Sequence, residues 1–167
     1  MKHIISAFIL LFLLSGCLKN EVVLDYSGIQ PVVLVPNSNW PPRGFGAGPL
    51  TDSVKGTTLL NLYAKVSYVN ALNKNVQVKF APDNALIAAY NTQWGTDYKL
   101  LPDSCYTVSS LDLTIPAETK QAFLPITLIP SKINPQYDYI LAYSITQADG
   151  LTVASNFKSM LFTLKGQ

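Results

Sequence analysis

The sequence predicts an all-β fold, an antiparallel β-sandwich of about seven strands with one short helix. Short segments in which apolar and polar residues alternate recur along the chain, and this period of two is typical of strands with one buried face. Pro, Gly, Asn and Asp separate the segments, as they do at turns. Charged residues make up only 13% of the chain, whereas aromatic residues make up 11% and include nine tyrosines, a composition that suits half-buried sheets.

Each predicted strand corresponds to one such segment. The longest alternation covers 60–68, where Leu60 and Leu62 begin one apolar face. A turn at 70–75 leads to the alternating segment 76–80, and we predict that these two strands pair as a hairpin. The remaining strands are predicted at 32–35, 111–115, 124–128, 139–145 and 160–164.

One helix of about nine or ten residues is predicted between the strands at 76–80 and 111–115. Asp83 or Asn84 can cap its first turn, and a cap is a more natural role for this pair than metal ligation. Leu86 and Tyr90 lie one turn apart, and Gly95 can end the helix.

The first residues have the pattern of a lipoprotein leader. Residues 4–14 carry no charge, and a helix of that length would cross only about half of a hydrocarbon core, so the segment indicates a secretory signal. Leu14-Ser15-Gly16-Cys17 follows, in which small residues precede a cysteine whose thiol can form a thioether to diacylglycerol. We therefore predict a lipoprotein signal peptide at 1–16 and lipidation of Cys17. The alternative is an ordinary secretory signal followed by an unrelated cysteine.

The remaining residues are enough for one domain. Residues 17–30 have no periodic pattern and are predicted to be a lipidated tether, and 31–167 are predicted to form one sandwich domain. Because lipid would use Cys17, Cys105 has no cysteine left to pair with, and it is either buried or linked to another chain. The strand-like segment 106–108 that follows Cys105 favours burial.

The residues needed for most catalysis are missing from the predicted mature chain. The only histidine, His3, lies in the leader, which excludes Ser-His-Asp and Cys-His nucleophiles and His-ligated zinc or iron. The ten acidic residues show neither a recognisable glycosidase pair nor a calcium-binding loop. We therefore predict that the protein is not an enzyme and binds no cofactor or metal. The 12 basic and 10 acidic residues nearly balance, so nothing favours a nucleic acid partner.

A long loop at 36–58 holds the candidate binding residues. Trp40, Arg43 and Phe45 offer the aromatic rings and hydrogen-bond donors that a sugar-binding site needs. The alternative for Trp40 is that it packs the loop against the sandwich. In the same loop, Ser53 lies in a triplet, Asp52-Ser53-Val54, that resembles a short O-glycosylation acceptor pattern. We expect Trp94, beyond this loop, to have a structural role.

Several motifs occur in order along the chain: Tyr90-Asn91, Tyr98-Lys99-Leu100-Leu101-Pro102, Tyr106, Ile115-Pro116-Ala117 and the segment 139–145. Together they resemble the domain of unknown function 1735 family, whose members are Ig-like domains in surface and periplasmic lipoproteins of Bacteroidetes. The chain departs from the family pattern at Glu118, where the family usually has Gly, and at Ala142, where it tends to have Pro. The resemblance implies an Ig-like sandwich in a setting of polysaccharide capture and uptake, and it implies no catalytic residues.

Two functions fit these observations. The first is a glycan-binding or accessory lipoprotein of polysaccharide uptake, with a polysaccharide ligand and outer-membrane uptake proteins as partners. The second is a structural or protein-interaction scaffold in the envelope. In either case the lipid on Cys17 would anchor the protein to the outer membrane. We expect the cell surface rather than the periplasmic face, although only one acidic residue, Glu21, closely follows the cysteine.

Overall fold

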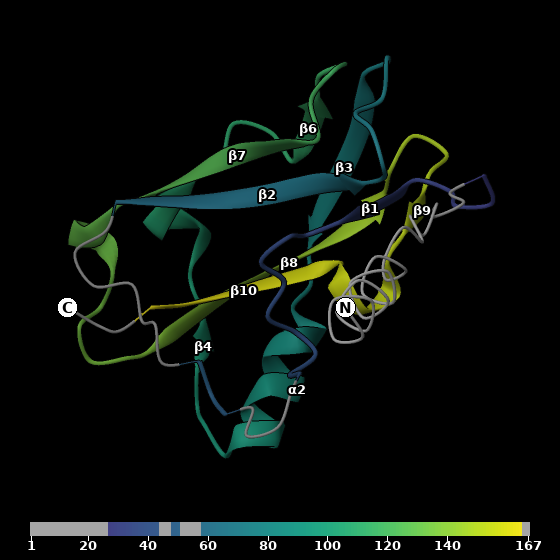
Figure 1. Ribbon diagram of the computed structural model, residues 1–167. Coiled ribbons are helices and arrows are strands. Elements are labelled where there is room, and N and C mark those ends of the chain that lie inside the picture. The colour runs from purple at the N-terminus through teal and green to yellow at the C-terminus, as the bar shows by residue number, and fades with distance from the viewer. Residues whose placement is uncertain (1–26, 44–47, 51–57, 165–167) are drawn as a thin grey trace, which may run out of the picture.

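The computed structural model describes residues 27–43, 48–50 and 58–164. Figure 1 shows two layers of strands, and one helix on the outer side of one layer. The all-β sandwich that the sequence predicts is confirmed. The predicted signal peptide at 1–16, Cys17 and most of the predicted tether lie outside the described residues.

The first layer, sheet A, is antiparallel except at one edge. The pairing of β1 with β9 is parallel and involves only two residues of each strand. In spatial order the sheet comprises β5 (Tyr106–Thr107), β7 (Gln121–Leu128), β2 (Leu59–Ser67), β1 (Val32–Leu34) and β9 (Thr152–Val153).

The second layer, sheet B, is built around a long central strand, β8 (Tyr139–Gln147). Its spatial order is β10 (Ser159–Leu164), β8, β3 (Val76–Pro82) and β6 (Asp112–Ile115), and β4 (Lys99–Leu100) also pairs with β8 in parallel. Helix α2 (Ala85–Trp94) lies between β3 and β4 in the chain. The one-turn helices η1 (Asp103–Cys105), η2 (Pro130–Lys132) and η3 (Ser155–Phe157) connect strands.

The predicted hairpin between the strands at 60–68 and 76–80 is wrong. These segments form β2 and β3, but β2 pairs with β1 and β7 in sheet A, whereas β3 pairs with β6 and β8 in sheet B. The turn between them therefore carries the chain from one layer to the other. The apolar faces of the two strands both point into the core between the sheets, so an alternating pattern alone could not tell this crossing from a hairpin.

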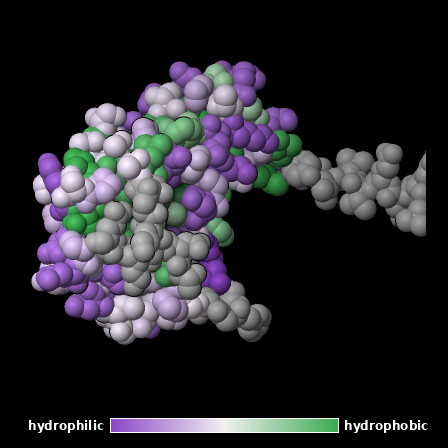
Figure 2. All heavy atoms as spheres, turned by 90° about the vertical axis from the view of Figure 1, so that its left-hand side faces the viewer, coloured by the Kyte–Doolittle hydropathy of each residue, from purple (hydrophilic) through white to green (hydrophobic). Residues whose placement is uncertain are grey.

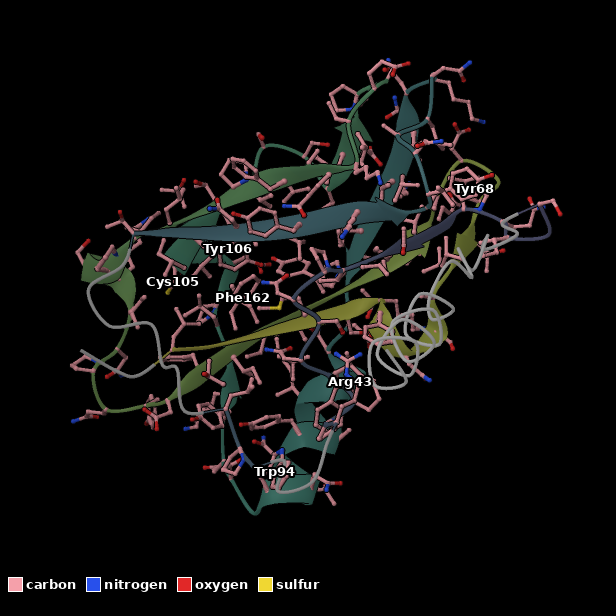
Figure 3. The ribbon with its side chains drawn as sticks, viewed as in Figure 1. Arg43, Tyr68, Trp94, Cys105, Tyr106 and Phe162 are labelled. Atoms are coloured by element: carbon pink, nitrogen blue, oxygen red, sulfur yellow. The ribbon has the colours of Figure 1, made fainter. Side chains whose placement is uncertain are left out.

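The main core fills the space between the two sheets. It takes alternate residues from the long strands, among them Leu62, Phe80 and Tyr143, each of which is at most 1% exposed. Cys105 belongs to this core, as predicted, and its thiol donates a hydrogen bond to the carbonyl oxygen of Lys132 (3.1 Å). Figure 3 shows Cys105 between the layers together with Phe162.

A second, smaller core covers the outer face of β8 and β10 in sheet B. Ile140 and Ala142 of β8 and Leu161 of β10 meet Ile87 and Tyr90 of α2 there. Strands β8 and β10 are thus buried on both faces, which explains why 139–145 reads as an almost unbroken apolar run rather than an alternation.

The helix α2 ends at Gly95 as predicted, but its first turn lacks the predicted side-chain cap. Gly95 closes it in the left-handed conformation (φ 62°), where a residue without a Cβ is least strained. Asn84 occupies the N-cap position, but its side chain makes no capping hydrogen bond. The carboxylate of Asp83 instead accepts a hydrogen bond from the hydroxyl of Ser144 (2.7 Å), so it attaches the start of the helix to β8.

The face in Figure 2 carries mostly polar residues, with hydrophobic ones in separate groups. Within the described part of the chain, no helix has both the length and the hydropathy needed to cross a membrane.

Candidate functional site

The segment 37–43 is fastened along the outer edge of β10. The side-chain amide of Asn39 donates to the carbonyl oxygen of Leu161 and accepts from its N–H, both at 2.8 Å, in the manner of a neighbouring strand. Trp40 continues the contact through an isolated bridge to Ser159. The segment thus covers backbone groups of an edge strand that would otherwise be open to pairing with another chain.

A pocket of about 250 Å³ lies between this segment and α2. We call it the tryptophan pocket, because Trp40 from the loop and Trp94 from the helix both line it, together with Tyr90 and Leu50. The ring centroids of Trp40 and Tyr90 are 5.9 Å apart with the planes tilted by 50°. The backbone N–H of Leu50 donates to the Tyr90 hydroxyl (2.6 Å), which fixes another part of the wall.

Arg43 stands at the rim of this pocket in a fixed position. Its guanidinium donates to the carbonyl oxygen of Asn156 (2.7 Å) and to that of Ser38, and it lies 3.9 Å from the centroid of the Phe157 ring. Figure 3 shows Arg43 and Trp94 on the same side of sheet B, near α2. Among the lining residues that the structure describes, Arg43 is the one with a charged side chain, so the local field favours neutral or anionic ligands.

Trp40 packs the loop against the sandwich, as the alternative interpretation predicts, and it also lines the pocket. It is half-buried and packs against the second core, as Trp94 does. The expected structural role of Trp94 is therefore confirmed, but the same side chain also forms a wall of the candidate site. Phe45 and Ser53 lie outside the described residues.

Sequence reasoning missed Tyr90 and Leu50 as site residues. Tyr90 and Trp94 are four residues apart on α2, and this spacing places both on one face of a helix, so the sequence carried a usable signal for Tyr90. Leu50 offered no such signal, because only the folded loop brings it to the Tyr90 hydroxyl.

The chemistry of the pocket is set by its aromatic rings and by Arg43. Burial raises the pKa of the Tyr90 phenol, which therefore stays protonated at neutral pH. No Asp or Glu is found among the described lining residues, and no group of three potential metal ligands occurs elsewhere in the described ranges. The pocket thus offers flat aromatic surfaces and one fixed cation.

Solved structures share this fold at low sequence identity. A candidate carbohydrate-binding protein from Bacteroides ovatus has 16% identity and a TM-score of 0.57 over 81% of this chain and 37% of its own. A two-domain protein of unknown function from Bacteroides fragilis has 15% identity and a TM-score of 0.56, covering 90% of this chain and 51% of its own. A third protein, of unknown function and from Bacteroides ovatus, has 15% identity and a TM-score of 0.58, covering 81% of this chain and 52% of its own.

The chain thus spans from about a third to about half of the length of these proteins. No curated protein sequence matches it. A family model described as "-like, N-terminal domain" matches residues 47–152, which is more than half of the 167 residues. The chain therefore belongs to this family of N-terminal domains.

Proposed function

We propose that the protein is a non-catalytic glycan-binding domain and that the tryptophan pocket is its sugar site. The observation that carries the proposal is the convergence of Trp40, Tyr90 and Trp94, from two distant segments, on one open pocket. Sugars present apolar C–H faces that stack on aromatic rings, and their hydroxyls need donors and acceptors of the kind found at this rim. A candidate carbohydrate-binding protein is among the structures that share the fold, which agrees with the proposal, although at 16% identity it shows the fold alone.

The proposed setting is the outer membrane, with lipid on Cys17 and polysaccharide uptake proteins as partners. It rests on the leader pattern and on the motif resemblance to the domain of unknown function 1735 family. The absence of catalysis at the tryptophan pocket is part of the proposal. A glycosidase needs two carboxylates beside the sugar, and the described lining of the tryptophan pocket contains neither Asp nor Glu.

The scaffold function remains the second candidate because of one surface feature. Tyr63 and Phe123 face each other across β2 and β7 on the outer side of sheet A, with ring centroids 5.3 Å apart. Phe123 is 51% exposed, so this aromatic pair is available to another protein.

The test is a glycan array followed by titration calorimetry on the full chain, purified in a zwitterionic detergent without sugar headgroups. We expect dissociation constants on the order of 10 μM to 1 mM for one small site. Trp94→Leu keeps an apolar side chain against the second core but removes the flat ring, and should weaken binding about fivefold or more, by analogy with base stacking on aromatic side chains.

Phe123→Ala is the matched control, because it removes an aromatic ring on the opposite sheet. A melting curve of each variant separates lost binding from lost folding. If Trp94→Leu binds as well as the parent chain while Phe123→Ala does not, the sugar site lies on sheet A and the tryptophan pocket is refuted. Release of reducing ends from any bound glycan would contradict the non-catalytic assignment.

A further inference from the structure

A second pocket, of about 370 Å³, lies beyond the C-terminal end of α2. Its walls are the segment 96–98, which follows the helix, and the turn 136–138, which precedes β8. The lining side chains are Thr96, Asp97, Tyr98, Gln136, Tyr137 and Asp138. We call it the carboxylate pocket, because both of its charged lining residues are acids.

The first wall is held in place by one asparagine. The side-chain oxygen of Asn91 accepts from the Tyr98 N–H (3.0 Å) and from the Thr96 hydroxyl (2.9 Å). Its side-chain nitrogen donates to the carbonyl oxygen of Tyr98 (2.8 Å). These three bonds fix the direction of the chain just after the left-handed turn at Gly95, so Asp97 and Tyr98 are presented from a rigid support.

The second wall is a turn that is tied to the first. The side-chain oxygen of Asn134 accepts from the Gln136 N–H (2.9 Å), and the Lys99 N–H donates to the carbonyl oxygen of Asp138 (3.0 Å). The Tyr137 ring is 40% exposed and is held from two sides. The Lys99 ammonium lies 3.4 Å from its centroid, and the Tyr139 ring meets it edge-on at 6.4 Å.

We propose that the carboxylate pocket is a second saccharide-binding site that prefers amine-bearing or neutral sugars over acidic ones. Two tyrosine rings, an amide, a hydroxyl and two carboxylates supply stacking surfaces and acceptors for sugar hydroxyls. The Asp97 and Asp138 carboxylates favour a protonated amine over a uronate or sulfate, and the Lys99 ammonium beside the Tyr137 ring offsets only part of this negative charge. Since the tryptophan pocket carries Arg43 instead, the two sites have opposite charge preferences.

The two pockets are joined by a row of aromatic side chains. Tyr98, which lines the carboxylate pocket, meets Tyr90 edge-on at 5.7 Å, and Tyr90 is the residue that contacts Trp40 in the tryptophan pocket. The proposal rests on the proposed glycan binding in that it assigns both pockets the same class of ligand. The sites nevertheless share no lining residue, so each can be disabled separately.

The experiment is titration calorimetry of the full chain with three oligosaccharide probes of equal length: glucosamine, N-acetylglucosamine and galacturonate oligomers, at a pH where the amine is protonated. We expect the glucosamine probe to bind better than the galacturonate probe in the Trp94→Leu background, where only the carboxylate pocket is intact. Raising the salt concentration should reduce that preference, because exposed charge pairs are screened.

Two substitutions test the pocket itself. Asp97→Asn keeps the shape and removes one exposed charge, and should weaken glucosamine binding about twofold to fivefold with little effect on the neutral probe. Tyr137→Ala removes the exposed ring and should weaken both probes about fivefold or more.

The outcomes separate the two proposals. If neither substitution alters binding while Trp94→Leu abolishes it, the carboxylate pocket is refuted and the tryptophan pocket stands. If Asp97→Asn and Tyr137→Ala weaken binding while Trp94→Leu does not, the second site stands and the first is refuted. Equal binding of the galacturonate and glucosamine probes in the Trp94→Leu background also overturns the proposed charge preference.

Discussion

Replacing Asn39 with alanine should detach the loop that carries Trp40 and Arg43 from the edge of β10. The substitution removes the two hydrogen bonds between the Asn39 side chain and the backbone of Leu161, each 2.8 Å long. At about 0.5–1.5 kcal/mol per bond, the free energy that holds the loop in place should fall by about 1–3 kcal/mol. The bridge between Trp40 and Ser159 and the packing of Trp40 against the second core remain in this variant.

The assay is hydrogen exchange at the Leu161 amide, because that N–H donates directly to Asn39. A loss of 1–3 kcal/mol corresponds to exchange that is about fivefold to 150-fold faster. Asn75→Ala is a matched control, since the Asn75 side chain also accepts from a backbone N–H, that of Ala117, but at a distant turn. Unchanged exchange of Leu161 in Asn39→Ala, or equal acceleration in both variants, would refute the reasoning. Glycan affinity should fall with Asn39→Ala, because the loop forms one wall of the tryptophan pocket.

Three further predictions concern lipidation, the helix end and alkaline pH. Cys17→Ala should abolish acyl labelling, and a labelled variant would contradict the lipoprotein prediction. Gly95→Ala should lower the free energy of unfolding by about 1 kcal/mol, because φ is 62° at that position. Gly28→Ala, at a site with open space and no positive φ, should leave it unchanged, and melting curves of the two variants test the difference. Burial raises the pKa of Tyr143, so the folded chain holds that phenolic proton more tightly than the unfolded chain. That contribution to stability is present below about pH 10 and is lost as the pH rises further. In Tyr143→Phe the free energy of unfolding, measured by denaturant titration, should therefore fall less steeply above about pH 10 than in the parent chain. An equally steep fall in both proteins would contradict the reasoning.

The sequence predicted the long elements well because each has a strong local signal. The alternation at 60–68 corresponds to β2, and the helix predicted between Asp83 and Gly95 corresponds to α2. The strands β4 and β9 were missed, since each has only two residues and no period can be recognised over that length. Strand pairing was harder still, because the crossing from β2 to β3 depends on which sheet each strand joins.

In the candidate site, too, residues with a local sequence signal could be predicted, whereas contacts between distant segments could not. Trp40 and Arg43 were recognised from loop composition, but their companions Tyr90 and Trp94 lie some fifty residues further along the chain. Only the docking of the loop on β10 and of the helix on β8 brings the two groups together. The carboxylate pocket was not predicted at all, because its two walls meet through the pairing of β4 with β8.

The burial of β8 and β10 of sheet B on both faces connects the fold with the proposed function. An ordinary sandwich leaves the outer face of each sheet to solvent, and sheet A does so with the exposed ring of Phe123. Sheet B instead places a second core under α2, and the side chains at the border of that core, Trp40, Trp94 and Tyr98, are the ones that line the two pockets. Since the same rings stabilise the helix and offer the binding surfaces, substitutions there will change stability and affinity together. Conservative replacements such as Trp94→Leu are therefore the informative ones, because they retain part of the packing while removing the flat surface.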